Sequence, residues 1–254
     1  MFDTHMHTNF STDSKMTIEA AIRKASELDI GIITTEHMDL NFPDKNQFIF
    51  DPDQYFNEYS KYRSDRVLLG IELGMITNQV EENRKVIESY PFDYVIGSVH
   101  LVDNMDVLDK NFYINRSKKD SYEHYFRYML DCIKTHSFVD SIGHIDYISR
   151  YAVYEDKEIY YEDFSEYIDE VLKAVISADK ALELNTRRLG NNDAINNLTK
   201  IYKRFYELGG RMITVGSDSH YENSIGFNFD MAKVIAENCK LKIVYFKERK
   251  PEFV

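Results

Sequence analysis

The chain has 254 residues, of which 43% are hydrophobic, and a formal net charge of −12. This length fits one large α/β domain as well as two smaller ones, and the hydrophobic content can fill a core without disulfides. The acidic balance argues against nucleic acid as a partner. No apolar run approaches the roughly 20 residues of a membrane span, so no membrane partner is expected.

The two cysteines, Cys132 and Cys239, are far apart in the sequence and form no CxxC pair. Both fall in helical patterns, so we interpret them as buried, reduced thiols. The first predicted strand begins at Met1, which leaves no room for a signal peptide. These features predict a cytoplasmic protein.

Predicted strands and helices alternate along the chain. After a strand at the N-terminus, residues 18–28 place apolar side chains on one helical face, with Thr17 as the N-cap. The segment Ile30–Thr35 is short, apolar and β-branched, which is typical of a buried parallel strand. Further strands are expected at 67–73, 94–99, 139–145, 181–185, 211–215 and 241–246, and further helices at about 53–62, 80–90, 119–136, 161–179, 192–208 and 229–238.

The organisation of these elements predicts one domain over residues 1–254, because no linker, charge block or repeat interrupts them. This number of strand–helix units favours a (β/α) barrel over an open sheet. Three long segments follow predicted strands on one side: Met38–Pro52, Leu101–Lys118 and Asp146–Tyr160. Loops of this length are usually functional, so we expect them to form walls and a lid around a site.

Residues of the kinds that bind metals recur at the ends of the predicted strands. In an extended chain, residues i and i+2 point to the same face, so His5 can converge with His7 and Asp218 with His220. The C-terminal ends of parallel strands are where α/β proteins build active sites. The candidate ligands are His5, His7, Asp13, His37, Glu72, His100, His144, Asp218 and His220.

Any one of these histidines alone is readily explained as a hydrogen-bonded core or surface residue. Their joint recurrence at strand ends favours a metal site, whereas His124 and His136 lie in a helical pattern and are expected to be structural. Imidazole and carboxylate ligands without thiolate suit zinc, manganese or iron. Nine ligands are enough for two to three divalent ions if a carboxylate bridges, and such ions predict metal-assisted hydrolysis of a phosphate ester.

The ordered motifs resemble those of the PHP (polymerase and histidinol phosphatase) family over essentially the whole chain. The motifs are His5–Thr8, Thr35–His37, Gly70–Glu72, Gly97–His100, Gly143–Asp146 and Gly216–His220. The resemblance implies a distorted (β/α)7 TIM-like barrel with a trinuclear metal centre. It implies that one ion is held by His5, His7, Glu72 and Asp218, a second by Glu72, His100 and His144, and a third by Asp13, His37 and His220. Glu72 would bridge the first two ions.

Several features are similar to the histidinol-phosphatase branch of the family, among them an aspartate at Asp13 and the segments 143–151, 182–186 and 226–230. That branch uses arginines to bind phosphate, and Arg150 matches one of them. The second match is open between Arg187 and Arg188, because Arg187–Gly190 stands where a small, glycine-containing stretch is commoner.

The resemblance implies hydrolysis of L-histidinol phosphate, a step of histidine biosynthesis. Asp218, His220 and Arg150 are expected to act at the reacting groups, and Glu36 or Asp39 to receive the amine and imidazole of the substrate. One alternative is a PHP phosphoesterase that acts on a phosphotyrosine protein or another small phosphomonoester. Another is a non-catalytic PHP module. The sequence leaves the oligomeric state open.

Overall fold

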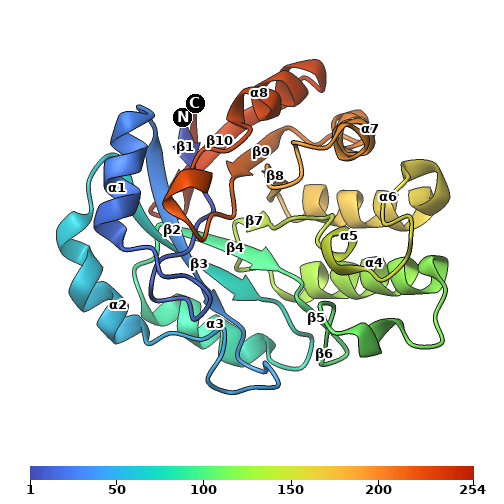
Figure 1. Ribbon diagram of the computed structural model, residues 1–254, viewed down its shortest axis with the longest axis horizontal. Helices are drawn as coiled ribbons and strands as arrows, with labels where there is room; N and C mark the ends of the chain where they lie inside the picture. Colours follow the sequence, from blue (N-terminus) through green and yellow to red (C-terminus); the bar gives the residue numbers. More distant parts are fainter.

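The computed structural model describes residues 1–254 as a barrel of parallel strands surrounded by helices (Figure 1). The parallel strands neighbour one another in the order β1-β2-β3-β4-β7-β8-β9. Their bounds are β1 (Phe2–Asp3), β2 (Gly31–Met38), β3 (Val67–Gly74), β4 (Tyr94–Ser98), β7 (Ser141–Ile142), β8 (Ala181–Asn185) and β9 (Met212–Gly216).

The first and last of these strands meet through backbone hydrogen bonds. The N–H of Thr4 donates to the carbonyl of Val215 at 3.1 Å, and the N–H of Asp218 donates to the carbonyl of His5 at 2.8 Å. These bonds bring the segment after β1 against the end of β9, so the sheet curves back onto itself. The predicted distorted (β/α)7 barrel is confirmed.

The distortion comes from two further strands, β10 (Lys242–Lys247) and β11 (Lys250–Phe253). β10 pairs in parallel with the start of β9, where Lys242 faces Met212, so β10 and the segment after β1 share one edge of β9. β11 returns antiparallel to β10 after a turn in which Glu248 and Arg249 have φ values of 50° and 65°. No sequence pattern predicted β11, because this turn lacks the usual glycine or asparagine and Pro251 disfavours a strand.

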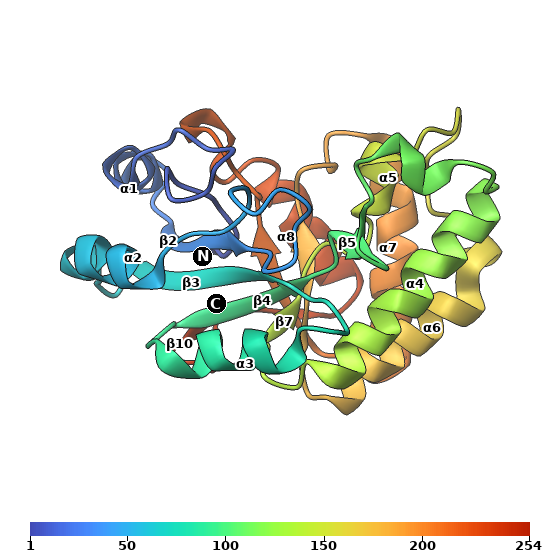
Figure 2. The same ribbon diagram turned by 90° about the horizontal axis from the view of Figure 1, so that it is seen from below.

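The predicted helices form around the outside of the barrel, and α4 and α6 lie side by side along one flank (Figure 2). Thr17 caps α1, since its side chain accepts a hydrogen bond from the N–H of Ala20. No helix has the combination of length and apolar character needed to cross a membrane. The bounds are α1 (Ile18–Glu27), α2 (Pro52–Tyr59), α3 (Val80–Ser89), α4 (Lys118–Thr135), α6 (Tyr161–Ser177), α7 (Asn192–Glu207) and α8 (Phe229–Asn238).

Two local predictions need correction. The strand expected at 139–145 is reduced to β7, Ser141–Ile142, because the N–H of His144 donates to the Glu183 carboxylate instead of to a neighbouring strand. Two of the three long segments are also partly ordered: Leu101–Lys118 contains the hairpin β5 (Leu101–Val102) and β6 (Met105–Asp106), and Asp146–Tyr160 contains the one-turn helix α5 (Ile148–Tyr151).

The barrel interior changes from apolar to polar along the strands. At the strand starts, a small buried cluster includes Ile33, Leu68 and Tyr94. Since side chains of a strand return to the same face every second residue, Ile33 shares its face with His37 and Leu68 shares its face with Glu72. The polar side chains therefore gather at the C-terminal end of the barrel.

Candidate metal centre

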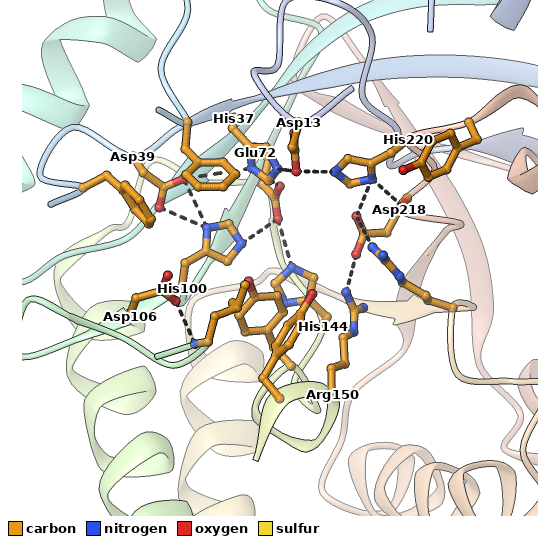
Figure 3. A pocket seen from close by; sticks show the side chains of 17 residues that line it. Asp13, His37, Asp39, Glu72, His100, Asp106, His144, Arg150, Asp218 and His220 are labelled. Atoms are coloured by element: carbon orange, nitrogen blue, oxygen red, sulfur yellow. Dashed lines mark hydrogen bonds and ion pairs between the residues drawn. The ribbon is translucent and has the colours of Figure 1, made fainter. Parts of the chain in front are cut away.

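The structure brings all nine candidate ligands together at this end of the barrel, and Figure 3 shows the part of the cluster that lines a cavity. His37 and Glu72 are in-register neighbours on β2 and β3, which fixes their side chains beside each other. His100 and His144 lie just beyond the C-terminal ends of β4 and β7. Most of these side chains are buried, and Asp13 is the most exposed of them at 36%.

Glu72 lies at the centre of the cluster, and its two oxygens face different sides. Oε2 is 3.3 Å from His5 Nε2 and 3.4 Å from His7 Nε2. Oε1 is 3.2 Å from His100 Nε2 and 2.9 Å from His144 Nε2. Ligand atoms about 2.0–2.1 Å from a tetrahedral zinc ion are separated from one another by about 3.3 Å. The spacing on each side of Glu72 therefore fits one ion.

Two further carboxylates complete the cluster. Asp218 Oδ1 is 3.5 Å from His7 Nε2, on the side of Glu72 Oε2. Asp13 Oδ2 is 2.8 Å from His220 Nε2 and 3.6 Å from His37 Nε2, which forms a third group of ligands.

Unpartnered buried atoms support this interpretation. His5 Nε2, His7 Nε2 and Glu72 Oε2 are buried and have no hydrogen-bond partner. A buried polar atom without a partner costs free energy, so such atoms are rare in native proteins. A metal ion between them would satisfy all three, so the residues present fit metal ions.

The histidines are held in orientations that leave a ligand atom free. His5 Nδ1 donates to Glu183 at 2.6 Å, and His100 Nδ1 donates to Asp39 at 3.0 Å. A carboxylate on one imidazole nitrogen fixes the ring and makes the other nitrogen a better ligand. No sequence pattern was used to predict this role of Glu183, although a carboxylate between the two buried leucines of β8 was a usable signal.

The charges of the cluster keep its carboxylates ionised. Burial by itself would raise the pKa of Glu72, but the charges on His5, His100 and His37 outweigh it and hold the pKa well below its usual range. For Asp218, the raising effect of burial is likewise outweighed, here by Arg150 and His5, and its pKa is also held low. Both side chains are therefore available as anionic ligands.

The three candidate phosphate-binding arginines occupy different surroundings. Arg150 Nη1 donates to Asp218 at 2.5 Å, while its buried Nε and Nη2 have no partner. Arg187 is half exposed and its Nη1 lies 3.7 Å from Asp218. Arg150 and Arg187 line the cavity beside the metal ligands. This cavity has a volume of about 230 Å³. Arg188 does not line it and is paired instead with Asp146 and Glu158.

Glu36 cannot bind substrate as expected, because it is fully buried and accepts hydrogen bonds from Thr8 and Ser11. Asp39 does line the cavity, but it is engaged by His100. The two histidines expected to be structural lie outside the cluster: His124 pairs with Asp103, and His136 contacts the backbone of its own helix.

Comparisons with known proteins show the family of this chain. The sequence profile of the PHP domain matches residues 3–187. The chain belongs to the PHP family. A probable histidinol-phosphatase of Clostridium acetobutylicum is 54% identical over 98% of both chains. A histidinol-phosphatase of Lactococcus lactis is 34% identical and is aligned over 86% of this chain and 83% of its own.

A solved structure extends the likeness of this PHP protein to the whole fold. The crystal structure of the L. lactis histidinol phosphate phosphatase, in complex with zinc, L-histidinol and phosphate, superposes with a TM-score of 0.94 at 30% identity. It covers 99% of this chain and 98% of the L. lactis chain. The match includes the segment after residue 187, which carries Asp218 and His220 and lies beyond the PHP domain profile.

Proposed function

We propose that this PHP-family protein hydrolyses L-histidinol phosphate to L-histidinol and phosphate. The observation that carries the proposal is the 54% identity, over nearly the whole chain, with a probable histidinol-phosphatase. The convergence of all nine candidate ligands on one cavity supports it and argues against a non-catalytic module. The proposed reaction class is therefore phosphomonoester hydrolysis.

The proposed cofactors are three divalent ions, one in each group of ligands. Zinc is the ion in the L. lactis complex, and the same imidazole and carboxylate ligands also suit manganese or iron. When bound, such ions supply charge that polarises phosphate oxygens and lowers the pKa of a water molecule. Glu72 would be shared by two of them, because its two oxygens face different histidine pairs.

The arginines provide the protein's own contacts to the phosphate. Arg150 presents two unpartnered N–H groups in a buried position, and the planar guanidinium matches the geometry of phosphate oxygens. Arg187 is the proposed second contact, because it lines the cavity and Arg188 does not. Both would stabilise negative charge as water adds to phosphorus, the phosphorus–oxygen bond to histidinol breaks and the departing oxygen takes up a proton. Asp218 and His220 line the same cavity, where each would hold a metal ion.

Turnover of a panel of phosphomonoesters tests the proposal. The panel contains L-histidinol phosphate, phosphotyrosine, glycerol phosphate and 4-nitrophenyl phosphate, assayed by phosphate release with zinc or manganese present. We expect the highest kcat/KM on L-histidinol phosphate. An equal or higher value on phosphotyrosine or glycerol phosphate would overturn the assignment of substrate.

A further inference from the structure

One carboxylate of the cavity has no role in holding metals. The cavity is lined by Asp13, Asp39, Glu72, Asp106 and Asp218. Four of these five lie within 4.0 Å of a histidine or arginine nitrogen, as described above. Asp106 makes no ion pair, and the only hydrogen bond of its side chain is the one that Oδ1 accepts from the N–H of Leu108 at 2.8 Å. Its other oxygen is thus free to accept a donor in the cavity.

Asp106 is fixed in place by the β5–β6 hairpin. Asp106 pairs with Leu101, the residue after the candidate ligand His100. The N–H of Val107 donates to the carbonyl of His100 at 3.1 Å, which ties the strand end directly to the metal centre. The carboxylate is therefore held beside the cluster by backbone pairing, and it needs little reordering when it binds a substrate.

Asp106 and Arg150 lie on opposite sides of the cavity. In Figure 3, Asp106 lies next to His100 on one side, while Arg150 and Asp218 lie on the other, with His144 between them. The phosphate of the proposed substrate belongs near Arg150. The nitrogen-bearing end of the same molecule, with its ammonium and imidazole groups, must then extend away from this arginine. On the side of the cavity opposite Arg150, Asp39 is paired with His100, whereas Asp106 has no cationic partner.

The surroundings of Asp106 favour a cationic or N–H donor. Partial burial raises the pKa of this carboxyl, and no positive side chain of the protein pairs with it. A carboxylate that has lost part of its hydration gains from a charged hydrogen bond to a ligand. A phosphomonoester without an N–H donor would leave it unpaired.

We propose that Asp106 selects the substrate by accepting a hydrogen bond from its nitrogen-bearing end, the ammonium or the imidazole N–H. This inference rests on the proposed function and adds to it a residue that determines specificity. Asp106 makes no contribution to bond cleavage itself, so its effect falls on KM more than on kcat.

The test is Asp106→Asn, because the amide oxygen retains the hydrogen bond from Leu108 and only the charge is lost. The matched control is Asp109→Asn, since Asp109 accepts a hydrogen bond from the N–H of Asn111 at 2.9 Å in the same way but lies outside the cavity. Both variants are assayed on L-histidinol phosphate, on its analogue without the amine and on 4-nitrophenyl phosphate. Metal content is measured for each.

We expect Asp106→Asn to lower kcat/KM on L-histidinol phosphate by about 10- to 100-fold, mainly through KM, and to leave 4-nitrophenyl phosphate and metal content unchanged. If the loss disappears on the analogue without the amine, the partner is the ammonium. If it persists there, the partner is the imidazole. Asp109→Asn should match the parent protein.

Two failures are distinguishable. If the parent protein shows no preference for L-histidinol phosphate over 4-nitrophenyl phosphate, the proposed function is wrong. If the parent has that preference and Asp106→Asn keeps it in full, or loses activity equally on all three substrates, the role of Asp106 is wrong while the proposed function stands.

Discussion

At the scale of single residues, Glu72 connects the ligand groups. It sits on β3 with 1% of its side chain exposed, and it lies within 3.4 Å of five histidine nitrogens. A carboxylate in this position supplies two oxygens and one negative charge to a cluster rich in imidazoles. No other side chain in the cluster faces all of these histidines.

Replacing Glu72 by glutamine should therefore remove more than one metal ion. The amide keeps the shape of the side chain but loses the charge and one of the two ligand oxygens, so it cannot bridge. We expect Glu72→Gln to contain less metal than the parent protein by more than one equivalent and to lose most of its activity, as measured by elemental analysis and phosphate release.

The control for this experiment is His124→Ala. His124 pairs with Asp103 near the surface, outside the cluster, so its removal should leave metal content and activity near those of the parent. Normal metal content in Glu72→Gln would show that Glu72 does not bridge. A large loss of metal or activity in His124→Ala would show that His124 belongs to the site.

At the scale of elements, the ligands come from strand ends and from the turns just beyond them. His37 and Glu72 lie within β2 and β3, but Asp218 and His220 follow the end of β9. Asp218 has a φ of 54°, a left-handed conformation that aspartate adopts more readily than most residues. The i, i+2 spacing at this position therefore converges through a turn and not through an extended strand.

The close packing of β9 against the segment after β1 gives a prediction. A Cβ added to Gly216 would lie 2.3 Å from His5 Cβ and 2.6 Å from Glu183 Oε1. Gly216→Ala must therefore push His5 away from the carboxylate that orients it. Overpacking of this kind costs about 1–3 kcal/mol, and we expect a lower Tm together with weaker metal binding.

Gly190→Ala is the matched control, because the nearest atom to its added Cβ is 3.7 Å away, an ordinary contact. Thermal melting and metal titration measure the Tm and the metal affinity of both variants. Equal metal affinity in Gly216→Ala and Gly190→Ala would contradict the tight packing around His5.

At the scale of the whole molecule, the metal centre joins the two ends of the chain. Its ligands run from His5 to His220, and the N- and C-termini lie close to each other at the barrel (Figure 1). Because the candidate ligands are scattered along the sequence, the unfolded chain cannot bind the ions as the folded chain does. Ions that bind only the folded state stabilise it by mass action.

Removal of the metals should consequently lower the melting temperature. An ion present at about 1,000 times its Kd contributes about 4 kcal/mol, which corresponds to a shift of about 8–16 °C in a chain of this size. We expect chelation to produce a shift of at least this order in calorimetry, and added zinc to reverse it. An unchanged Tm after proven loss of metal would rule out the stabilising role.

The sequence by itself determined the order of most helices and strands and the identity of the candidate ligands. Short apolar runs indicate buried parallel strands, and the polar residues that follow such strands must meet at one end of a barrel. The motif order also pointed to the PHP family, which the comparisons confirm. These features depend on local pattern and on a general rule of topology.

Only the tertiary structure decided how the side chains divide their contacts. Arg187 and Arg188 are adjacent and chemically identical, yet one lines the cavity and the other pairs with Asp146 and Glu158. Glu36 is likewise buried among hydroxyl groups, while Asp106, from a hairpin that no pattern predicted, faces the cavity. The direction of a side chain depends on partners that are distant in sequence, and no local pattern contains those partners.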